Sequence, residues 1–390
     1  MFKTVILAQD ASLAKAAQTW AVDSGYARVL KAFPSYPANP YEVARLLSQH
    51  DPELVLLHAA DPEQALGLGV AIRSKSSNVS VIVMGGSFSE DMETEFRQAG
   101  IEPLTGTFTI DKFAASIRNA IYYARADLMR NLFLFLPAKA GNGASTVALN
   151  IAAAMANGLE KKVLLAEGDL HSGILSTMLN VQPRAPLVDV LQNAESLDYS
   201  VWENIIVHAH SIDLLPTDRS KKAPLPSWVN YHQLLRFAAP RYDNVLVDLP
   251  EVVNDATADL VHYAKTVFVV CTPEFPSLTL AGQRLKELES KGLPRDRAEI
   301  VLNRWHKGDI SAAQVEDLVK AKVAVVIQND YRAVNSATVA GRPVKPQTEL
   351  GLAFLNFAKK LIGMPAPPKP PESSGFGLLR ALRTGTPVLR

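Results

Sequence analysis

The chain has 390 residues, of which 48% are hydrophobic and 20% charged, and this favours two or three domains with buried cores. The formal net charge of +1 argues against a broadly basic nucleic-acid-binding protein. The single cysteine, Cys271 in the run TVFVVCTP, excludes a disulfide framework and favours a buried apolar side chain over a nucleophile, in a reducing cytoplasm. Neither a secretory signal nor a membrane span is predicted, because polar residues interrupt every apolar run too early.

The first part of the chain alternates short apolar runs with segments of helical period, the pattern of a parallel α/β fold. Strands are predicted at Thr4–Leu7, Arg28–Ala32, Leu54–His58 and Val79–Met84. Helices are predicted at Ser12–Ser24, Tyr41–His50, Glu90–Ala99 and Asp111–Ala124. About five βα units in about 125 residues are typical of a flavodoxin-like domain, which we place at residues 1–126.

Two segments of this region, PELVLLHAA and AGIEPLTGTF, resemble response-regulator receiver domains. A receiver carries a phosphoacceptor aspartate, an acidic pair that holds magnesium, and a lysine that contacts the phosphoryl group. Here His58 stands at the phosphoacceptor position and Gly106 at the lysine position, and only Asp10, beside Gln9, remains of the acidic pair. Because acyl-phosphate formation and magnesium binding both require carboxylates, we predict a degenerate receiver-like domain that serves docking or dimerisation.

A second α/β series begins near residue 127 and predicts another doubly wound parallel sheet, over residues 127–364. Its strands are expected at Leu132–Leu136, Lys162–Ala166, Ile212–Leu215, Val245–Asp248, Val267–Thr272 and Glu299–Asn303, with Val323–Ile327 as an edge strand. The composition changes at Pro365, where PAPPKPPESSG reads as an extended proline-rich linker within the tail, residues 365–390.

A glycine-rich loop connects the first strand of this series to its first helix, in the segment FLFLPAKAGNGASTVALNI of residues 133–151. Loop amides and the positive end of the helix dipole then meet at one point, which binds phosphate without help from a side chain. Gly141 and Gly143 allow the backbone to close around the anion, and Ser145 or Thr146 offers a hydroxyl to Mg²⁺. The helix is expected at Thr146–Ala156. The alternative is a glycine-rich turn that binds nothing.

The loop resembles that of the MinD/ParA ATPases, whose pattern is Lys-Gly-Gly-x-Gly-Lys-Ser/Thr-Thr. The run from Lys139 to Thr146 keeps the first lysine and both hydroxyl residues, with Ala140 for the first glycine and Ala144 for the second lysine. The resemblance implies that Lys139 reaches the phosphates of a partner subunit in a nucleotide-bridged dimer. Without the second lysine the loop lacks one charge-assisted hydrogen bond, worth roughly 1.5–3 kcal/mol. We therefore predict that nucleotide binding is weakened about ten- to hundredfold and that hydrolysis is affected more.

Three later motifs follow in the order expected after such a loop. LLAEGDLHSG places Glu167 and Asp169 where the family has an Asp-x-Asp core. RYDNVLVDLPE is a hydrophobic strand that ends in an acid, Asp248, which could hold Mg²⁺ through water. IVLNRW supplies Asn303 where relatives contact the adenine edge. Each residue alone is more often a cap or turn residue, but their order favours a nucleotide site.

The resulting site prediction has ATP and Mg²⁺ as cofactors. The catalytic candidates are Lys139, Asp169 and Asp248. The candidate nucleotide-binding residues are Ala140, Gly141, Asn142, Gly143, Ala144, Ser145, Thr146, Asn303 and Arg304. The candidate metal ligands are Ser145 and Asp248.

Longer runs of this second region resemble the CpaE/TadZ pilus-assembly branch of the MinD/ParA ATPases. The runs are DLPEVVNDATADLVHYAKTVFVVCTPEFPSL, IVLNRWHKGDIS and VVIQNDYRAVNSATVAGRPV. That branch joins an atypical receiver domain to a MinD-like domain, and the resemblance covers about residues 1–365. It implies a cytoplasmic homodimer, at the cell pole or the inner membrane, that meets pilus-assembly and polar-localisation proteins and helps to place and assemble a Tad (Flp) type IV pilus machine.

The tail carries a short amphipathic run, FGLLRALR, with two arginines. It could lie on an anionic membrane as a peripheral contact, and an isolated helix this short would need dimerisation for avidity. A disordered end or a partner-docking peptide is the other interpretation.

Three functions are therefore weighed. The favoured one is a nucleotide-responsive localisation and assembly factor with slow or absent hydrolysis. The second is an active ATPase that cycles like MinD between dimer and monomer, with Lys139 replacing the missing lysine. The third is a ParA-like DNA-partition protein, against which the near-neutral charge speaks, so that no specific nucleic acid is expected.

Overall fold

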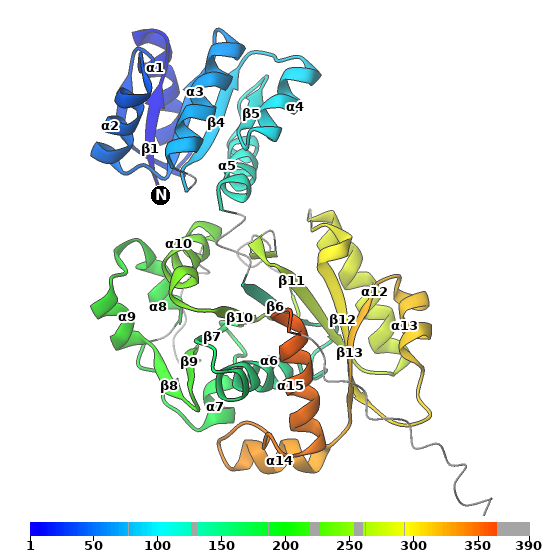
Figure 1. The fold of residues 1–390 in the computed structure, drawn as a ribbon. Coiled ribbons are helices and arrows are strands. Elements are labelled where there is room, and N and C mark those ends of the chain that lie inside the picture. Colours follow the sequence, from blue (N-terminus) through cyan, green and yellow to red (C-terminus); the bar gives the residue numbers. More distant parts are fainter. Residues whose placement is uncertain are drawn as a thin grey trace, which may run out of the picture.

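The computed structural model describes residues 1–76, 78–125, 131–185, 187–217, 227–252, 260–261, 263–291 and 293–364. These residues form two β-sheets, of five and eight strands, with helices packed against them (Figure 1). The predicted α/β class is thereby confirmed. We call residues 1–125 the N-terminal unit and residues 131–364 the P-loop unit. The proline-rich linker and the run FGLLRALR lie outside the described residues.

The N-terminal sheet has the strand order of flavodoxin-like proteins, and all of its pairs are parallel. Its strands, in the order β2-β1-β3-β4-β5, are β1 (Phe2–Leu7), β2 (Ala27–Phe33), β3 (Leu54–His58), β4 (Ser80–Gly85) and β5 (Glu102–Thr105). The helices are α1 (Ala11–Asp23), α2 (Pro40–His50), α3 (Pro62–Lys75), α4 (Glu90–Gln98) and α5 (Ile110–Arg125). The predicted strands and helices all appear at the expected places; β5 and α3, for which no bounds were predicted, complete the alternation.

The side chains of Asp10 and Gln9, at receiver-like positions, hold the local backbone. The Asp10 carboxylate caps α1 by accepting the N–H groups of Ser12 and Leu13, at 2.8 and 2.9 Å. The Gln9 amide oxygen accepts the Ala60 N–H at 3.0 Å. His58 ends β3, and its carbonyl accepts the Tyr36 hydroxyl. These contacts agree with the prediction of a receiver fold without receiver chemistry.

Glu102 on β5 is a buried acid whose burial is incompletely compensated. Its side chain is 5% exposed, and Oε1 accepts the Asn119 amide at 2.9 Å. Within the described residues, Oε2 has no hydrogen-bond partner. Burial raises the pKa of Glu102 to about 6.

We expect Glu102→Gln to increase the free energy of unfolding at pH 8 by roughly 1–2 kcal/mol. The folded-state pKa lies above the unfolded value, so the folded chain holds the Glu102 proton more tightly. The stability that this bound proton contributes is complete below the unfolded-state pKa and is lost as the pH rises to about 6. Urea unfolding at pH 4 and pH 8 measures the effect. An equal gain at both pH values would contradict it.

The P-loop unit is built on an eight-stranded sheet with the order β13-β12-β11-β6-β10-β7-β9-β8. The strands are β6 (Leu132–Pro137), β7 (Val163–Glu167), β8 (Val207–Ala209), β9 (Ile212–Leu215), β10 (Asn244–Asp248), β11 (Thr266–Cys271), β12 (Ala298–Trp305) and β13 (Val323–Gln328). β13 lies at one edge, as predicted. β8 at the other edge was not predicted, and it pairs with β9 antiparallel. Its turn, His210–Ser211, has φ of 50° and 63° without the glycine or asparagine that signals such a hairpin.

The helices of this unit cover the two faces of its sheet. They are α6 (Ala144–Ala153), continued by a π-helical turn (Ala154–Gly158), α7 (Leu175–Leu179), α8 (Leu187–Gln192), α9 (Tyr199–Ile205), α10 (Trp228–Ala238), α12 (Phe275–Ser290), α13 (Ala312–Val319), α14 (Tyr331–Val339) and α15 (Glu349–Leu361). One apolar core joins the sheet to α6, α7 and α15, and a second core joins it to α8, α10, α12 and α13. Because Gly143 accepts the Val147 N–H, α6 begins two residues earlier than the predicted Thr146.

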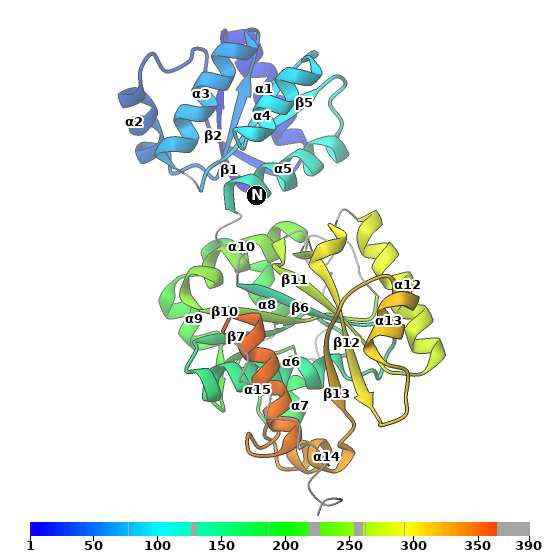
Figure 2. The ribbon, with the colours of Figure 1, turned by 45° about the vertical axis from the view of Figure 1, so that its right-hand side comes forward.

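Helix α10 lies on the side of the P-loop unit that faces the N-terminal unit (Figures 1 and 2). Arg236 on α10 forms an ion pair with the buried Glu53, which directly precedes β3. The rings of Phe2 and His232 lie 5.3 Å apart. The N-terminal unit therefore has specific side-chain contacts with the P-loop unit.

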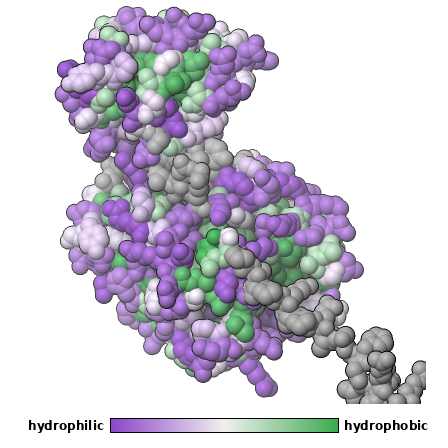
Figure 3. All heavy atoms as spheres, viewed as in Figure 1, coloured by the Kyte–Doolittle hydropathy of each residue, from purple (hydrophilic) through white to green (hydrophobic). Residues whose placement is uncertain are grey.

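Polar side chains cover most of the face drawn in Figure 3, with apolar side chains in small patches. Among the described helices, none has the length and apolar character that crossing a bilayer requires.

Candidate functional site

The loop between β6 and α6 leads into a helix N-terminus that no described side chain caps. Gly141 and Gly143 both adopt left-handed backbone conformations, with φ of 84° and 90°. Gly143 is the N-cap residue of α6, and no side chain caps this helix. Amides in a first helical turn have no intrahelical acceptors, and here they meet the positive end of the helix dipole. The loop therefore has the geometry of an anion site.

A cavity of about 680 Å³ lies over this loop. Nine of the sequence-predicted site residues line it: Ala140, Gly141, Gly143, Ala144, Ser145, Thr146, Asp169, Asp248 and Arg304. Its other walls come from the segment after β7 and from the residues after Asp248, including Glu251. Four strands and the loop thus bring together residues that are far apart in the sequence.

Three predicted residues do not line this cavity. The Asn142 side chain points into the protein, where Nδ2 donates to Ser277 Oγ at 2.7 Å. Asn303 donates its Nδ2–H to the Asn142 carbonyl at 2.8 Å. Both asparagines therefore hold the loop through hydrogen bonds on its buried side. The third residue, Lys139, is exposed at the start of the loop.

A smaller cavity of about 180 Å³ adjoins the first and shares Gly143, Thr146 and Arg304 with it. Asn303 lines this cavity, at the end of the site where the predicted contact with a base would fall. Arg304 stands between the two cavities with φ of 56°, a left-handed conformation that costs energy for a residue other than glycine. Such strain is most often retained at binding sites, which agrees with the choice of Arg304 as a site residue.

Asp248 is the most perturbed acid in the cavity. Its side chain is 3% exposed, and burial raises its pKa to about 8, against the opposing hydrogen bond from Ser145. The charges of Glu167 and Asp169 raise that pKa further. No partner for Asp248 Oδ1 is found within the part of the chain that the structure describes.

Ser145 and Asp248 together suit a magnesium ion. A hydroxyl and a carboxylate oxygen without a partner are hard oxygen ligands of the kind that Mg²⁺ uses together with phosphate oxygens and water. The described residues contain no cluster of three or more His, Cys, Asp or Glu side chains suited to hold a metal alone. Two protein oxygens leave the other positions around a Mg²⁺ ion to phosphate oxygens and water.

The two acids after β7 have different environments. Glu167 is fully buried, and its carboxylate accepts the N–H groups of Leu175 and Thr217, at 2.6 and 2.8 Å. Burial raises the pKa of Glu167. A Cβ at Gly173 would lie 2.3 Å from that carboxyl carbon, so any side chain there would displace the Glu167 carboxylate. Glu167 therefore fastens the loop, whereas Asp169 lines the cavity.

Two acids interact with residues at the start of the loop or with Arg304. Glu274 precedes α12, and its pKa is lowered first by the Thr272 hydroxyl and further by the positive charges of Lys139 and Arg304. Glu251 accepts the Ala140 N–H at 2.8 Å. The sequence prediction missed Glu251, although an acid three residues after a strand-end aspartate was a visible signal.

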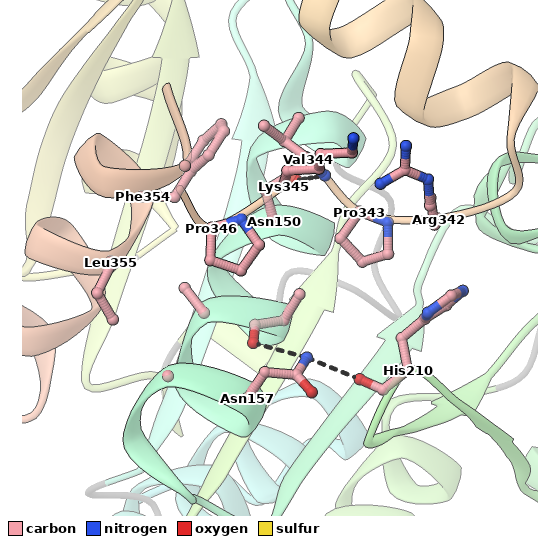
Figure 4. A pocket seen from close by; sticks show the side chains of 14 residues that line it. Asn150, Asn157, His210, Arg342, Pro343, Val344, Lys345, Pro346, Phe354 and Leu355 are labelled. Atoms are coloured by element: carbon pink, nitrogen blue, oxygen red, sulfur yellow. Dashed lines mark hydrogen bonds between the residues drawn. The ribbon is translucent and has the colours of Figure 1, made fainter. Parts of the chain in front are cut away.

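A third cavity, of about 310 Å³, lies beside α6 and is lined by none of the predicted site residues. Figure 4 shows Pro343 and Pro346 above Asn157, with Leu355 and His210 to either side. Asn150 of α6 accepts the Val344 N–H at 2.8 Å (Figure 4). It also donates to the Thr146 carbonyl at 2.8 Å. This buried amide joins the P-loop helix to the segment before α15, a role that the sequence analysis did not foresee.

The comparisons with known proteins concern about three fifths of the chain. No protein-family model matches it. An uncharacterized ATP-binding protein of Methanocaldococcus jannaschii is 27% identical over 233 residues, or 58% of this chain and 86% of that protein. The septum site-determining protein MinD of Synechocystis is 24% identical over 250 residues, or 61% and 92% of the two chains. The crystal structure of a ParA family ATPase from Chlorobium tepidum has a TM-score of 0.54 at 26% identity, covering 59% of this chain and 98% of that one.

The strand-loop-helix anion site, the parallel sheet and these relatives together define a P-loop protein. More narrowly, they support placing it in the MinD/ParA-like ATPase superfamily.

Proposed function

We propose that the chain is a nucleotide-responsive localisation and assembly factor that binds Mg–ATP at its P-loop and hydrolyses it slowly or not at all. The supporting observation is the uncapped N-terminus of α6, which lies beside Ser145 and the buried Asp248. The first-turn amides of a helix without a side-chain cap, a hydroxyl, and a carboxylate oxygen without a partner among the described residues suit a phosphate chain with its magnesium ion. The related protein of Methanocaldococcus jannaschii is described as ATP-binding, which supports the choice of nucleotide.

Weak turnover is proposed because the cation expected inside the loop is absent. Ala144 is 4% exposed and lines the cavity where a lysine would meet the phosphates. Stabilising the charge that develops on phosphoryl oxygens is a large part of phosphoryl-transfer catalysis. Lys139 is the remaining lysine of the loop, and it is exposed at the rim, where it suits contact with a second subunit. We therefore propose a nucleotide-bridged homodimer.

The pilus-assembly role is proposed from the resemblance of about residues 1–365 to CpaE/TadZ. The absence of receiver chemistry at His58 and Gly106 supports docking over phosphorelay for the N-terminal unit. We propose domain boundaries at residues 126 and 364, and a cytoplasmic location with polar or peripheral membrane contacts. The relation to MinD favours an active, cycling ATPase as the second candidate.

Calorimetric titration of the purified chain with Mg–ATP, repeated on Lys139→Ala, tests the proposal. We expect binding by the parent chain and about tenfold weaker binding by the variant, because one charge-assisted contact is lost. Sedimentation with and without Mg–ATP should show a nucleotide-dependent dimer in the parent chain alone. The absence of nucleotide binding by the parent chain would reject the proposal. Turnover at rates typical of MinD-like enzymes would favour the cycling ATPase.

A further inference from the structure

Glu251 places a negative charge inside the proposed phosphate site. It stands three residues after Asp248, and its Oε2 accepts the Ala140 N–H at 2.8 Å across 111 positions of sequence. Both residues line the large cavity. The chain therefore binds one of its own loop amides with a carboxylate.

A carboxylate and a phosphate oxygen make the same kind of contact with a backbone amide. Both are anionic acceptors, and a charge-assisted hydrogen bond to an N–H group is stronger than a neutral one. They cannot share this amide, because two anions at hydrogen-bond distance of one donor repel each other. A phosphate that reaches Ala140 must first displace Glu251.

The arrangement of the two cavities indicates which phosphate this would be. The small cavity, where a base would lie, meets the large one at Gly143, Thr146 and Arg304. Ala140 and Glu251 line only the large cavity, so they lie beyond this junction. A phosphate chain that runs from the junction across the first turn of α6 meets them with its terminal group.

We propose that Glu251 is a specificity-determining residue that makes the site favour a nucleoside diphosphate over a triphosphate. This inference rests on the proposed nucleotide-binding function. The Glu251 carboxylate takes the place of the terminal phosphate, so a diphosphate binds beside it without competition. A triphosphate binds only after the carboxylate has left the Ala140 amide.

Calorimetric titration of the full chain with Mg–ADP and with Mg–ATP tests the proposal on Glu251→Ala and Glu251→Gln. We expect Glu251→Ala to tighten Mg–ATP binding about tenfold and to change Mg–ADP binding less than about threefold. Glu251→Gln retains an oxygen that can accept the Ala140 N–H but carries no charge, so its gain for Mg–ATP should be smaller and still selective. Unchanged thermal unfolding midpoints show that the variants are folded.

Glu274→Ala is the matched control, because it removes a carboxylate that interacts with Lys139 and Arg304 but lines neither cavity. It should change the binding of both nucleotides by the same factor. The inference alone is overturned if Glu251→Ala leaves the ADP-to-ATP affinity ratio unchanged, or if Glu274→Ala shifts that ratio equally. If neither the parent chain nor any variant binds either nucleotide, the proposed function is rejected. The inference is then rejected with it.

Discussion

Lysine in place of Ala144 is expected to tighten the binding of Mg–ATP about ten- to hundredfold. Ala144 is the first residue of α6 and lines the cavity, so we expect a lysine at this position to extend into the phosphate site. The added ammonium group would form charge-assisted hydrogen bonds with phosphate oxygens. Without nucleotide, the same charge faces the positive end of the helix dipole and should cost roughly 0.3–1 kcal/mol of stability. Calorimetric titration and urea unfolding measure the two effects.

Ala144→Met is the matched control, because methionine fills similar space without charge. It should leave nucleotide affinity unchanged within about threefold. An equal gain in the lysine and methionine variants would attribute the effect to packing. No gain in either would mean that the phosphate chain does not pass Ala144, which would contradict the assigned site.

Asp248→Asn is expected to stabilise the nucleotide-free protein at pH 9 by about 2–5 kcal/mol, and to weaken Mg²⁺-dependent ATP binding at least about tenfold. The Asp248 carboxylate is buried near Glu167 and Asp169, with a folded-state pKa of about 8. Because that pKa is raised, the folded chain keeps a proton that the unfolded chain has lost. The stability of the parent protein therefore falls as the pH rises from about 4 to about 8 and then levels off.

Urea unfolding between pH 4 and pH 9, with a chelator present, measures the first effect. The advantage of Asp248→Asn should grow through that range and nearly vanish at pH 4. Asp169→Asn is the control, because the Asp169 carboxylate lines the same cavity and is only partly buried. It should alter the free energy of unfolding by less than about 1 kcal/mol. A constant advantage for Asp248→Asn at every pH would show that ionisation of Asp248 is not the cause. Such a trade of stability for binding is common at functional sites.

Most of the fold was predictable because its signals are local. β-branched and leucine-rich runs mark strands whose two faces are both buried, such as β3 and β10, and their places agree with the structure. β8 was missed because three residues carry no usable period, and because its turn lacks the usual glycine or asparagine. The early start of α6 was missed because Gly143 acts as an N-cap through its backbone alone.

The site was predictable where a residue acts through its backbone or through its order along the chain. Gly141 and Gly143 have the left-handed conformations that their residue type suggested. Asn303 was expected at the adenine edge, which stays a prediction; the structure adds that its amide donates to the Asn142 carbonyl while it lines the smaller cavity. Sequence order locates a residue at a strand end, but which neighbouring acceptor its side chain reaches depends on packing.

By itself, the sequence determined a phosphate-binding loop without its lysine, because Gly141, Gly143 and Ala144 are adjacent in the chain and their geometry is local. Only the tertiary structure decided what surrounds that loop. It brings Glu251 to the Ala140 amide across 111 positions, and it buries Asp248 beside two other acids. Both contacts depend on how separate strands pair in the sheet. The charge and burial around a side chain there are set by residues from several segments, so no single segment predicts them.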